Sequence, residues 1–139
     1  MIRSGLAACL SVIACLHADA ASAASTDREK LVGDEVVGYF KGNTVYVDIV
    51  PGKPFGKGGL SPFYYAADGR FAATLPNSKL AGTWQISDKA SYCINIPKYG
   101  KTFCTNVFRT DKGLEHHSVG LKKLMGPVKR LVPGNAEKL

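Results

Sequence analysis

Residues 91–109 read SYCINIPKYGKTFCTNVFR, two runs of alternating side chains with a short turn between them. Aromatic and aliphatic residues occupy every second position of the first run, and Cys93 stands between them on the other, more polar face. Cys104 has similarly polar neighbours in the second run. The stretch therefore predicts an antiparallel hairpin whose strands, Ser91–Ile96 and Thr102–Arg109, bring the two cysteines together on one face.

Residues 1–23 predict a cleaved export signal. A basic start is followed by the apolar run Gly5–Leu16, and small residues then form two A-x-A cleavage sites. The run has about half the length that a membrane-spanning helix needs, so a permanent anchor is the weaker interpretation. We therefore expect a single domain, residues 24–139, in the periplasm or secreted from the cell. The alternative is a lipid anchor at Cys15, because residues 12–15 loosely resemble a lipobox.

Export also determines the state of the cysteines. Cys9 and Cys15 belong to the signal, so Cys93 and Cys104 remain as a pair in an oxidising compartment. Such a pair favours a structural disulfide over a metal or redox site. Closing a loop of about 12 residues stabilises a fold by about 3 kcal/mol in the chain-entropy model. We expect one small domain held by one covalent bridge.

Runs of period two also flank the hairpin on both sides. Short turns separate these runs, so neighbouring strands must be antiparallel. An open meander would leave exposed edges and an uncovered apolar face, and closure removes both. We therefore predict a mainly β protein, a small antiparallel meander β-barrel of about seven to eight strands, in preference to a two-layer sandwich. The further strand candidates are Asn43–Ile49, Pro62–Ala67, Arg70–Leu75, Leu80–Ile86 and Leu114–Val119.

The end of the chain, residues 120–139, leaves two alternatives open. Three apolar residues near its start have the spacing of a helical turn, which Gly126-Pro127 interrupts. Val128–Val132 is equally compatible with a strand that closes the barrel.

One short amphipathic helix is predicted ahead of the strands, within Ser25–Lys41. Thr26 and Glu29 have the spacing of a capping box, which satisfies backbone amides at a helix start, and Gly42 supplies a stop. Glycines weaken the first half of the pattern, so the helix begins either at the capping box or only at Asp34. We expect it to pack on the barrel wall or to plug one end. Its apolar face comprises Val32, Val36, Tyr39 and Phe40.

The only tryptophan follows a glycine in the string Gly82-Thr83-Trp84. A large ring two residues after a glycine in a strand indicates a core side chain laid against a gap. The string resembles the G-x-W motif of lipocalin-like barrels, in which the tryptophan closes the barrel floor and an arginine from another strand covers it. That resemblance implies that Arg109 is the arginine that covers Trp84. The two residues are therefore a candidate ligand pocket. The motif lies on the first strand in that family and mid-chain here, so the likeness implies architecture alone.

A wider pattern resembles a group of small exported proteobacterial proteins of unknown function. The resemblance covers most of the chain after the signal and implies an exported, all-β protein. Because the group has no assigned activity, it implies no functional residue. The matching pieces are Gly42-Asn43-Thr44, Asp68-Gly69-Arg70, Gly82-Thr83-Trp84, Cys93 with Cys104, and Gly134-Asn135.

Lysine and arginine outnumber acidic residues by 18 to 11, which gives a formal net charge of +7. This charge favours an acidic or anionic partner, or it simply keeps the domain in solution. The glycine-rich segment 51–59 is no P-loop, because its glycine spacing is wrong and glycine follows Lys57. It predicts a cationic contact loop or a plain linker. The predicted partner-binding residues are Lys53, Phe55, Lys57, Lys122, Lys123, Lys129 and Arg130.

His116 and His117 are neighbours on a predicted strand, so their side chains point to opposite faces and do not readily share one metal ion. No acidic or cysteine residue has the spacing that completes a zinc site. Whether one of the two is an axial haem ligand or a buried, hydrogen-bonded histidine stays open. Ser118 has no identifiable acid to orient a neighbouring histidine. We therefore predict no metal site, no cofactor and no catalytic residue.

These observations favour a non-enzymatic periplasmic binding or accessory protein that docks on another protein or on an anionic envelope component. Peripheral contact with a membrane is compatible with the charge, and no nucleic-acid partner is expected. One alternative is a carrier of a small apolar ligand inside the barrel, near Trp84. Another is an inhibitor of a secreted hydrolase that uses the N-terminal segment or a loop as a plug. A hydrolytic enzyme comes last among the hypotheses.

Overall fold

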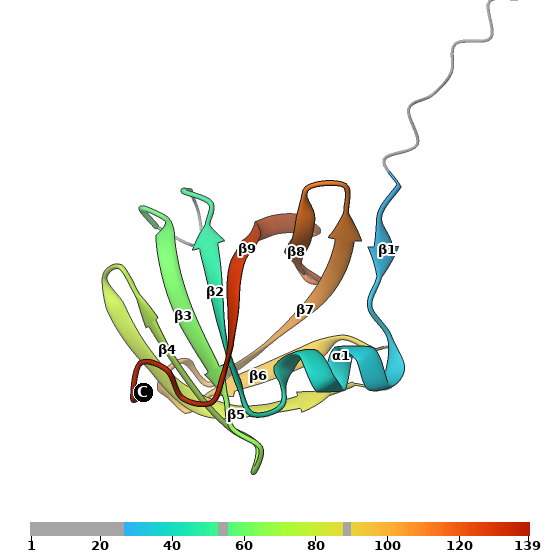
Figure 1. Cartoon of the computed structure of the whole chain (residues 1–139). Coiled ribbons are helices and arrows are strands. Elements are labelled where there is room, and N and C mark those ends of the chain that lie inside the picture. Colours follow the sequence, from blue (N-terminus) through green and yellow to red (C-terminus); the bar gives the residue numbers. More distant parts are fainter. Residues whose placement is uncertain (1–26, 53–55, 88–89) are drawn as a thin grey trace, which may run out of the picture.

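The computed structural model describes residues 27–52, 56–87 and 90–139 of the chain, so the predicted signal and Cys15 lie outside the described residues. The described chain forms nine strands, one α-helix and a 3₁₀ turn (Figure 1). In chain order these are β1 (Glu29–Lys30), α1 (Gly33–Phe40), β2 (Asn43–Ile49), β3 (Gly59–Tyr65), β4 (Arg70–Leu75), β5 (Ser78–Ile86), β6 (Tyr92–Ile96), the 3₁₀ turn (Pro97–Tyr99), β7 (Lys101–Thr110), β8 (Gly113–Ser118) and β9 (Lys123–Pro133).

Eight of these strands close into an antiparallel barrel. From β2 to β9 each strand pairs with the next along the chain, and β9 returns to pair with β2. The predicted meander barrel is confirmed, and β9 decides the alternatives left for residues 120–139 in favour of a closing strand. Gly126 permits this closure, because a Cβ there would lie 2.1 Å from the backbone oxygen of Asp48 on β2.

The helix is shorter than the capping box predicted. It covers Gly33–Phe40, and the preceding residue, Val32, makes no side-chain cap bond and is 55% exposed. Glu29 lies instead in β1, opposite Arg109 of β7. Backbone pairing with β7 takes up the segment that the pattern assigned to a helix start, so the capping-box prediction is wrong. Its other member, Thr26, lies outside the described residues.

Phe40, the last residue of α1, lies at the centre of the barrel core. Its ring centroid is 4.3 Å from that of Tyr92 and 4.6 Å from that of Tyr65. The rings of His116 and Trp84 follow at 5.7 and 6.3 Å. These four rings come from β6, β3, β8 and β5, so one side chain of the helix joins strands from around the barrel. The helix therefore plugs the barrel, as the sequence predicted for one of its two placements.

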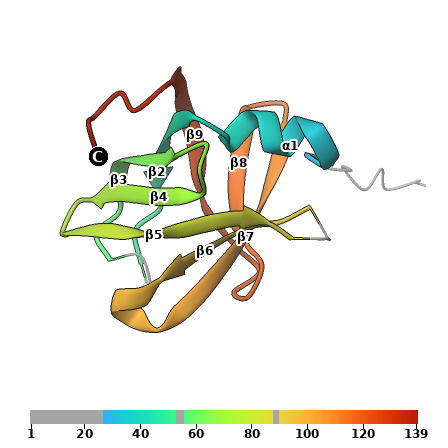
Figure 2. The same cartoon turned by 90° about the horizontal axis from the view of Figure 1, so that it is seen from below.

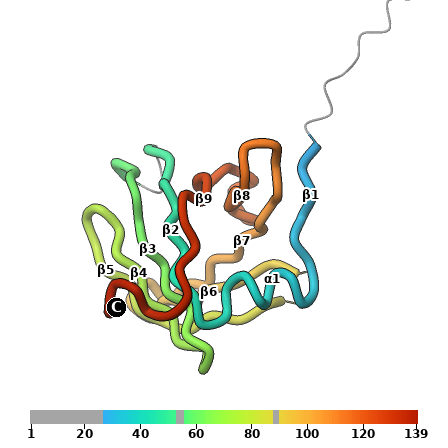
Figure 3. The backbone as a smooth tube through the Cα atoms, viewed as in Figure 1, coloured from blue at the N-terminus to red at the C-terminus, as the bar shows by residue number. Residues whose placement is uncertain are grey.

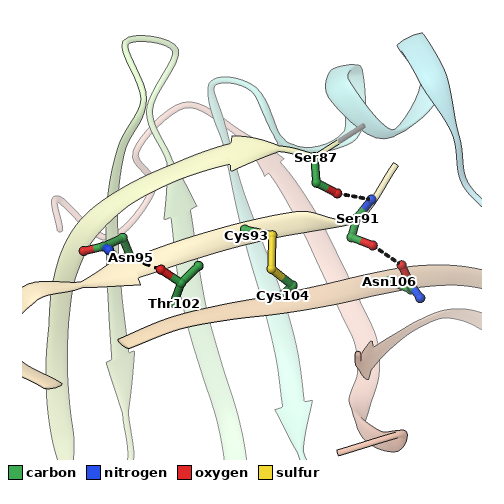
Figure 4. Close-up of a disulfide and its surroundings, with 7 residues drawn as sticks. All are labelled: Ser87, Ser91, Cys93, Asn95, Thr102, Cys104 and Asn106. Carbon is green, nitrogen blue, oxygen red and sulfur yellow. Dashed lines mark hydrogen bonds between the residues drawn. A yellow bond between two sulfur atoms is a disulfide. The ribbon is translucent and has the colours of Figure 1, made fainter. Parts of the chain in front are cut away.

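The Cys93–Cys104 disulfide is also confirmed. The two residues are register partners on β6 and β7, with an S–S distance of 2.02 Å. Figure 4 shows the bridge between two polar contacts that join the same strands. The Ser91 hydroxyl donates to Asn106 Oδ1 at 2.6 Å on one side, and Asn95 Nδ2 donates to Thr102 Oγ1 at 3.2 Å on the other. The bridge thus lies on the polar face of the hairpin and leaves the inner face to core side chains.

Candidate functional site

The barrel has two different ends. Strands of a meander barrel alternate in direction, so successive connections lie at opposite ends. The helix end carries α1 and the β3–β4, β5–β6 and β7–β8 connections. The loop end carries the β2–β3, β4–β5, β6–β7 and β8–β9 connections. Figure 2 shows the β4–β5 and β6–β7 hairpins projecting to the left, away from α1.

Both ends of the barrel carry lysines, and they differ in the acidic residues that accompany them. At the helix end Arg109 bonds to Glu29 and Glu35, and Arg70 pairs with Asp68 at 2.8 Å. The sequence of the four loop-end connections contains lysines and no Asp or Glu. Within the described residues the loop-end lysines form no ion pair. The described lysines in these connections, or within two residues of them, are Lys57, Lys79, Lys98, Lys101, Lys122 and Lys123. On the same criterion one carboxylate, that of Asp48, lies at this end, and it pairs with Lys129 at 3.7 Å.

Two of the predicted cationic groups share the loop end. The Val50 amide, at the start of the β2–β3 connection, donates to the Met125 carbonyl of β9 at 2.9 Å. This bond ties the connection that holds Lys57 to the start of β9, where Lys122 and Lys123 lie. All three lysines are exposed. Segments more than 60 residues apart in the sequence therefore contribute charge to one end of the barrel.

Lys129 and Arg130 lie elsewhere, on the outer wall along β9. Lys129 Nζ is 3.7 Å from Asp48 Oδ2, and the Arg130 guanidinium lies 4.0 Å above the ring of Tyr46. Intramolecular contacts therefore engage these two predicted partner-binding residues, and neither adds to the loop end. Two further predicted residues, Lys53 and Phe55, lie outside the described residues.

The tail that follows β9 lies against the same wall. Thr44 Oγ1 donates to the Gly134 carbonyl at 2.7 Å, and the Tyr46 hydroxyl bonds to Glu137. Figure 3 shows the tail turning away from α1 after β9. These contacts bury Thr44 and Tyr46, which a two-residue alternation would place on the solvent face of β2.

The loop end also exposes large apolar side chains that the sequence analysis did not single out. Each lies in a turn or within three residues of one. Turn residues predict a loop, but they do not predict which neighbouring apolar side chains stay exposed. The exposed apolar residues of the loop end are Leu60 (56% exposed), Tyr99 (46%), Phe103 (42%), Val119 (41%) and Leu121 (45%).

Trp84 and Arg109, the predicted pocket residues, contact different partners. The Trp84 indole donates to the Ala66 carbonyl at 2.8 Å, and its ring packs near Tyr65 at 5.7 Å. Arg109 is half exposed and bonds to acidic residues of β1 and α1. Gly82 serves a different purpose from the one expected, because a Cβ there would lie 1.8 Å from the carbonyl oxygen of Asn95. The glycine allows β6 to approach β5.

The inner wall holds a buried group of polar rings. His116 Nδ1 lies 3.2 Å from the Tyr92 hydroxyl, and burial lowers the pKa of His116 to about 3. The imidazole is therefore neutral at physiological pH. Burial also raises the pKa of Tyr92 to about 12, and it raises the pKa of Tyr39. His116 Nε2 and the Tyr39 hydroxyl are buried without a hydrogen-bond partner among the described residues.

The neighbouring histidine faces outward, as the strand pattern predicted. His117 Nε2 lies 3.0 Å from Glu115 Oε2, and its ring packs edge-on against Phe108 at 5.1 Å. The described ranges bring no group of three potential metal ligands together. An open surface depression of about 430 Å³ lies outside the barrel at the helix end, lined by Asp27, Arg28, Glu29, Arg109 and Thr110.

In the described parts of the chain, no helix has the length and apolar character needed to cross a membrane. Neither a protein-family model, nor a curated protein, nor a solved structure matches this chain. The fold defines it as a closed, helix-plugged meander barrel of eight strands. Its candidate site is the cationic loop end of that barrel.

Proposed function

We propose that this protein is a non-enzymatic binding or accessory protein of the periplasm or the extracellular space. It docks, through the loop end of its barrel, on an anionic component of the cell envelope or on an acidic face of another protein. The observation that carries the proposal is a difference in charge between the two ends: the loop-end connections contain lysines and no acidic residue, whereas the helix end carries both signs.

A surface that serves solubility alone mixes both signs of charge. The helix end has this character, because Arg109 and Arg70 are each paired with carboxylates. The loop end differs, since its connections contain lysines and no acidic residue. A surface that carries only positive charge makes the electrostatic potential positive at the loop end. That potential orients the loop end toward a negatively charged partner. The difference in charge between the ends therefore favours a docking role over a solubility role.

The filled interior favours the outer surface over a ligand cavity as the place of binding. The rings of Phe40 and Tyr65 lie 6.3 and 5.7 Å from that of Trp84, where the carrier hypothesis would place an apolar ligand. Phe40, Tyr65 and Tyr92 are all buried against one another. A ligand at this position would have to displace these rings.

Site-specific photocrosslinking in the native envelope tests the proposal. A photoreactive residue replaces Leu121 at the loop end or, as the matched control, Val32 at the helix end. Both positions are exposed and apolar. We expect adducts from position 121 and few from position 32.

The dependence of these adducts on charge completes the test. Replacing Lys122 and Lys123 by Glu should remove the adducts from position 121, because the loop end then no longer attracts an anionic partner. Equal adduct yields from positions 121 and 32, or adducts that survive the charge reversal, would contradict the proposal.

A further inference from the structure

Two neighbouring turns of the loop end carry a mixed surface of lysines and apolar residues. The β6–β7 turn region reads KYGKTF at residues 98–103, and the β8–β9 turn region reads VGLKK at residues 119–123. The Val119 amide donates to the Cys104 carbonyl of β7 at 2.9 Å, so the second region begins beside the Phe103 end of the first. We define this lysine–apolar patch as Lys98, Tyr99, Lys101, Phe103, Val119, Leu121, Lys122 and Lys123.

The apolar members of the patch are unusually open. Tyr99, Phe103, Val119 and Leu121 each expose more than two fifths of their surface. Lys98 Nζ lies 5.7 Å from the Tyr99 ring centroid, so charge and aromatic surface are adjacent. Neither turn region contains an acidic residue. The patch thus combines cations with apolar side chains at protruding turns.

We infer that the lysine–apolar patch docks on a phospholipid bilayer that contains anionic lipids. This inference rests on the proposed function and names the partner of the same surface. Lysines near a bilayer surface are attracted by anionic headgroups, and each adds to the affinity. Tyrosine and other amphipathic or apolar side chains favour the interface between headgroups and acyl chains. The patch supplies both kinds of contact without a repelling carboxylate.

Three features favour a bilayer over a protein as the partner. Lysine is depleted in protein–protein interfaces, where arginine and tryptophan are the enriched anchors. The β6–β7 turn projects from the barrel (Figure 2), and the surface depression lined by Arg109 and Thr110 lies at the other end. The acidic residues that contact Arg109 and Arg70 are also at that other end. An anionic plane would therefore meet the loop end with these acidic residues at the far end of the barrel.

Vesicle sedimentation with the exported, disulfide-bonded protein tests the inference. The probes are vesicles of phosphatidylglycerol mixed with phosphatidylcholine and vesicles of phosphatidylcholine alone. We expect binding to the first at low salt and little binding to the second. Lys122→Glu with Lys123→Glu should lower the partition coefficient by at least about tenfold. Tyr99→Ser with Leu121→Ser should lower it several-fold, because apolar area no longer enters the interface.

Matched controls carry the same chemical changes outside the patch. Lys112→Glu with Lys138→Glu makes the same change in net charge, and Val32→Ser removes an equally exposed apolar side chain. Both should bind the anionic vesicles as the parent does. Far-ultraviolet circular dichroism and thermal unfolding establish that every variant compared is folded.

The outcomes separate this inference from the function on which it rests. Absence of binding to phosphatidylglycerol vesicles, or equal losses in the patch and control variants, would overturn docking on a bilayer. If position 121 then crosslinks to a protein in a manner that needs Lys122 and Lys123, the proposed function stands with a protein partner. If position 121 crosslinks to nothing as well, both proposals fail.

Discussion

The two ends of this barrel are stabilised in different ways. At the helix end the Phe40 ring joins aromatic side chains from four strands, and ion pairs connect β1, α1 and β7. At the loop end the β6–β7 hairpin is held by the Cys93–Cys104 disulfide and by hydrogen bonds between polar side chains. Large apolar residues there remain in contact with solvent.

The comparison shows that the two ends of the barrel contribute differently to the protein. Buried contacts at the helix end stabilise the fold, whereas turn residues at the loop end are exposed to solvent. A ring cluster and a plug need buried surface, so Val36, Tyr39 and Phe40 of α1 are buried in the core. A covalent bridge stabilises a hairpin without using its turn residues, so the loop end is free to present them. We therefore expect changes at the helix end to act on stability and changes at the loop end to act on binding.

Removing the plug should have the largest effect. Phe40→Ala deletes a fully buried ring and should lower the free energy of unfolding by about 3 to 5 kcal/mol, as measured by denaturant unfolding. Tyr99→Ala deletes a ring at the loop end and should change it by less than about 1 kcal/mol. Similar losses in the two variants would show that the division between the ends is wrong.

Removing the disulfide should have the next largest effect on the free energy of unfolding. Replacing Cys93 and Cys104 together by Ala should lower the free energy of unfolding by about 3 kcal/mol, since the bridge closes a loop of sequence separation 11. Ser91→Ala, which removes a flanking hydrogen bond, is the control and should cost about 1 kcal/mol. A loss below that of the control would mean that hydrogen bonding and core packing hold the hairpin without the bridge.

His116 should make stability depend on pH. Its pKa is lowered from 6.5 to about 3 in the folded protein, so the unfolded chain binds the extra proton between these values. The contribution is fully present above pH 6.5 and is lost as the pH falls toward 3, by up to about 1.4 kcal/mol per pH unit. His116→Phe should flatten that part of the profile in denaturant titrations. If the free energy of unfolding changed with pH in the same way in the variant and the parent, His116 would not be the source of this pH dependence.

The smallest effect on stability should come from the loop-end charges. Lys122→Glu with Lys123→Glu changes two exposed turn residues and should alter the free energy of unfolding by no more than about 0.5 kcal/mol. Thermal unfolding of the variant and the parent measures this directly. A large loss would mean that these lysines support the fold, and their effect on binding could then not be assigned to docking.

The sequence predicted the barrel because strand periodicity and turn residues are local signals. Its capping-box error has a long-range cause, since β1 pairs with a strand some 80 residues further on. The closing strand was ambiguous because Gly126-Pro127 interrupts a helix and a strand alike. Only the approach of β2 to Gly126, at a distance where a Cβ would clash, explains the glycine.

The candidate site was predictable in part. Alternating strands imply which connections share an end, so Lys57, Lys122 and Lys123 could have been grouped from the topology alone. The pairing of Lys129 with Asp48 depends on the register of β9, which shifts at a bulge opposite Tyr46 and Val47. The exposure of Tyr99 and its apolar neighbours depends on tertiary packing, which no local pattern specifies.

Retention on native envelope membranes tests the central claim most directly. The disulfide-bonded protein is compared with a loop-end variant, Lys122→Glu with Lys123→Glu, and with the control Lys112→Glu with Lys138→Glu, which makes the same change in net charge outside the loop end. The parent and the control should be retained at low salt and released as the screening length falls from about 30 Å to about 8 Å, whereas the loop-end variant should be released at every salt concentration. Equal retention of the loop-end variant and the parent would contradict the claim that the protein docks through this end of its barrel.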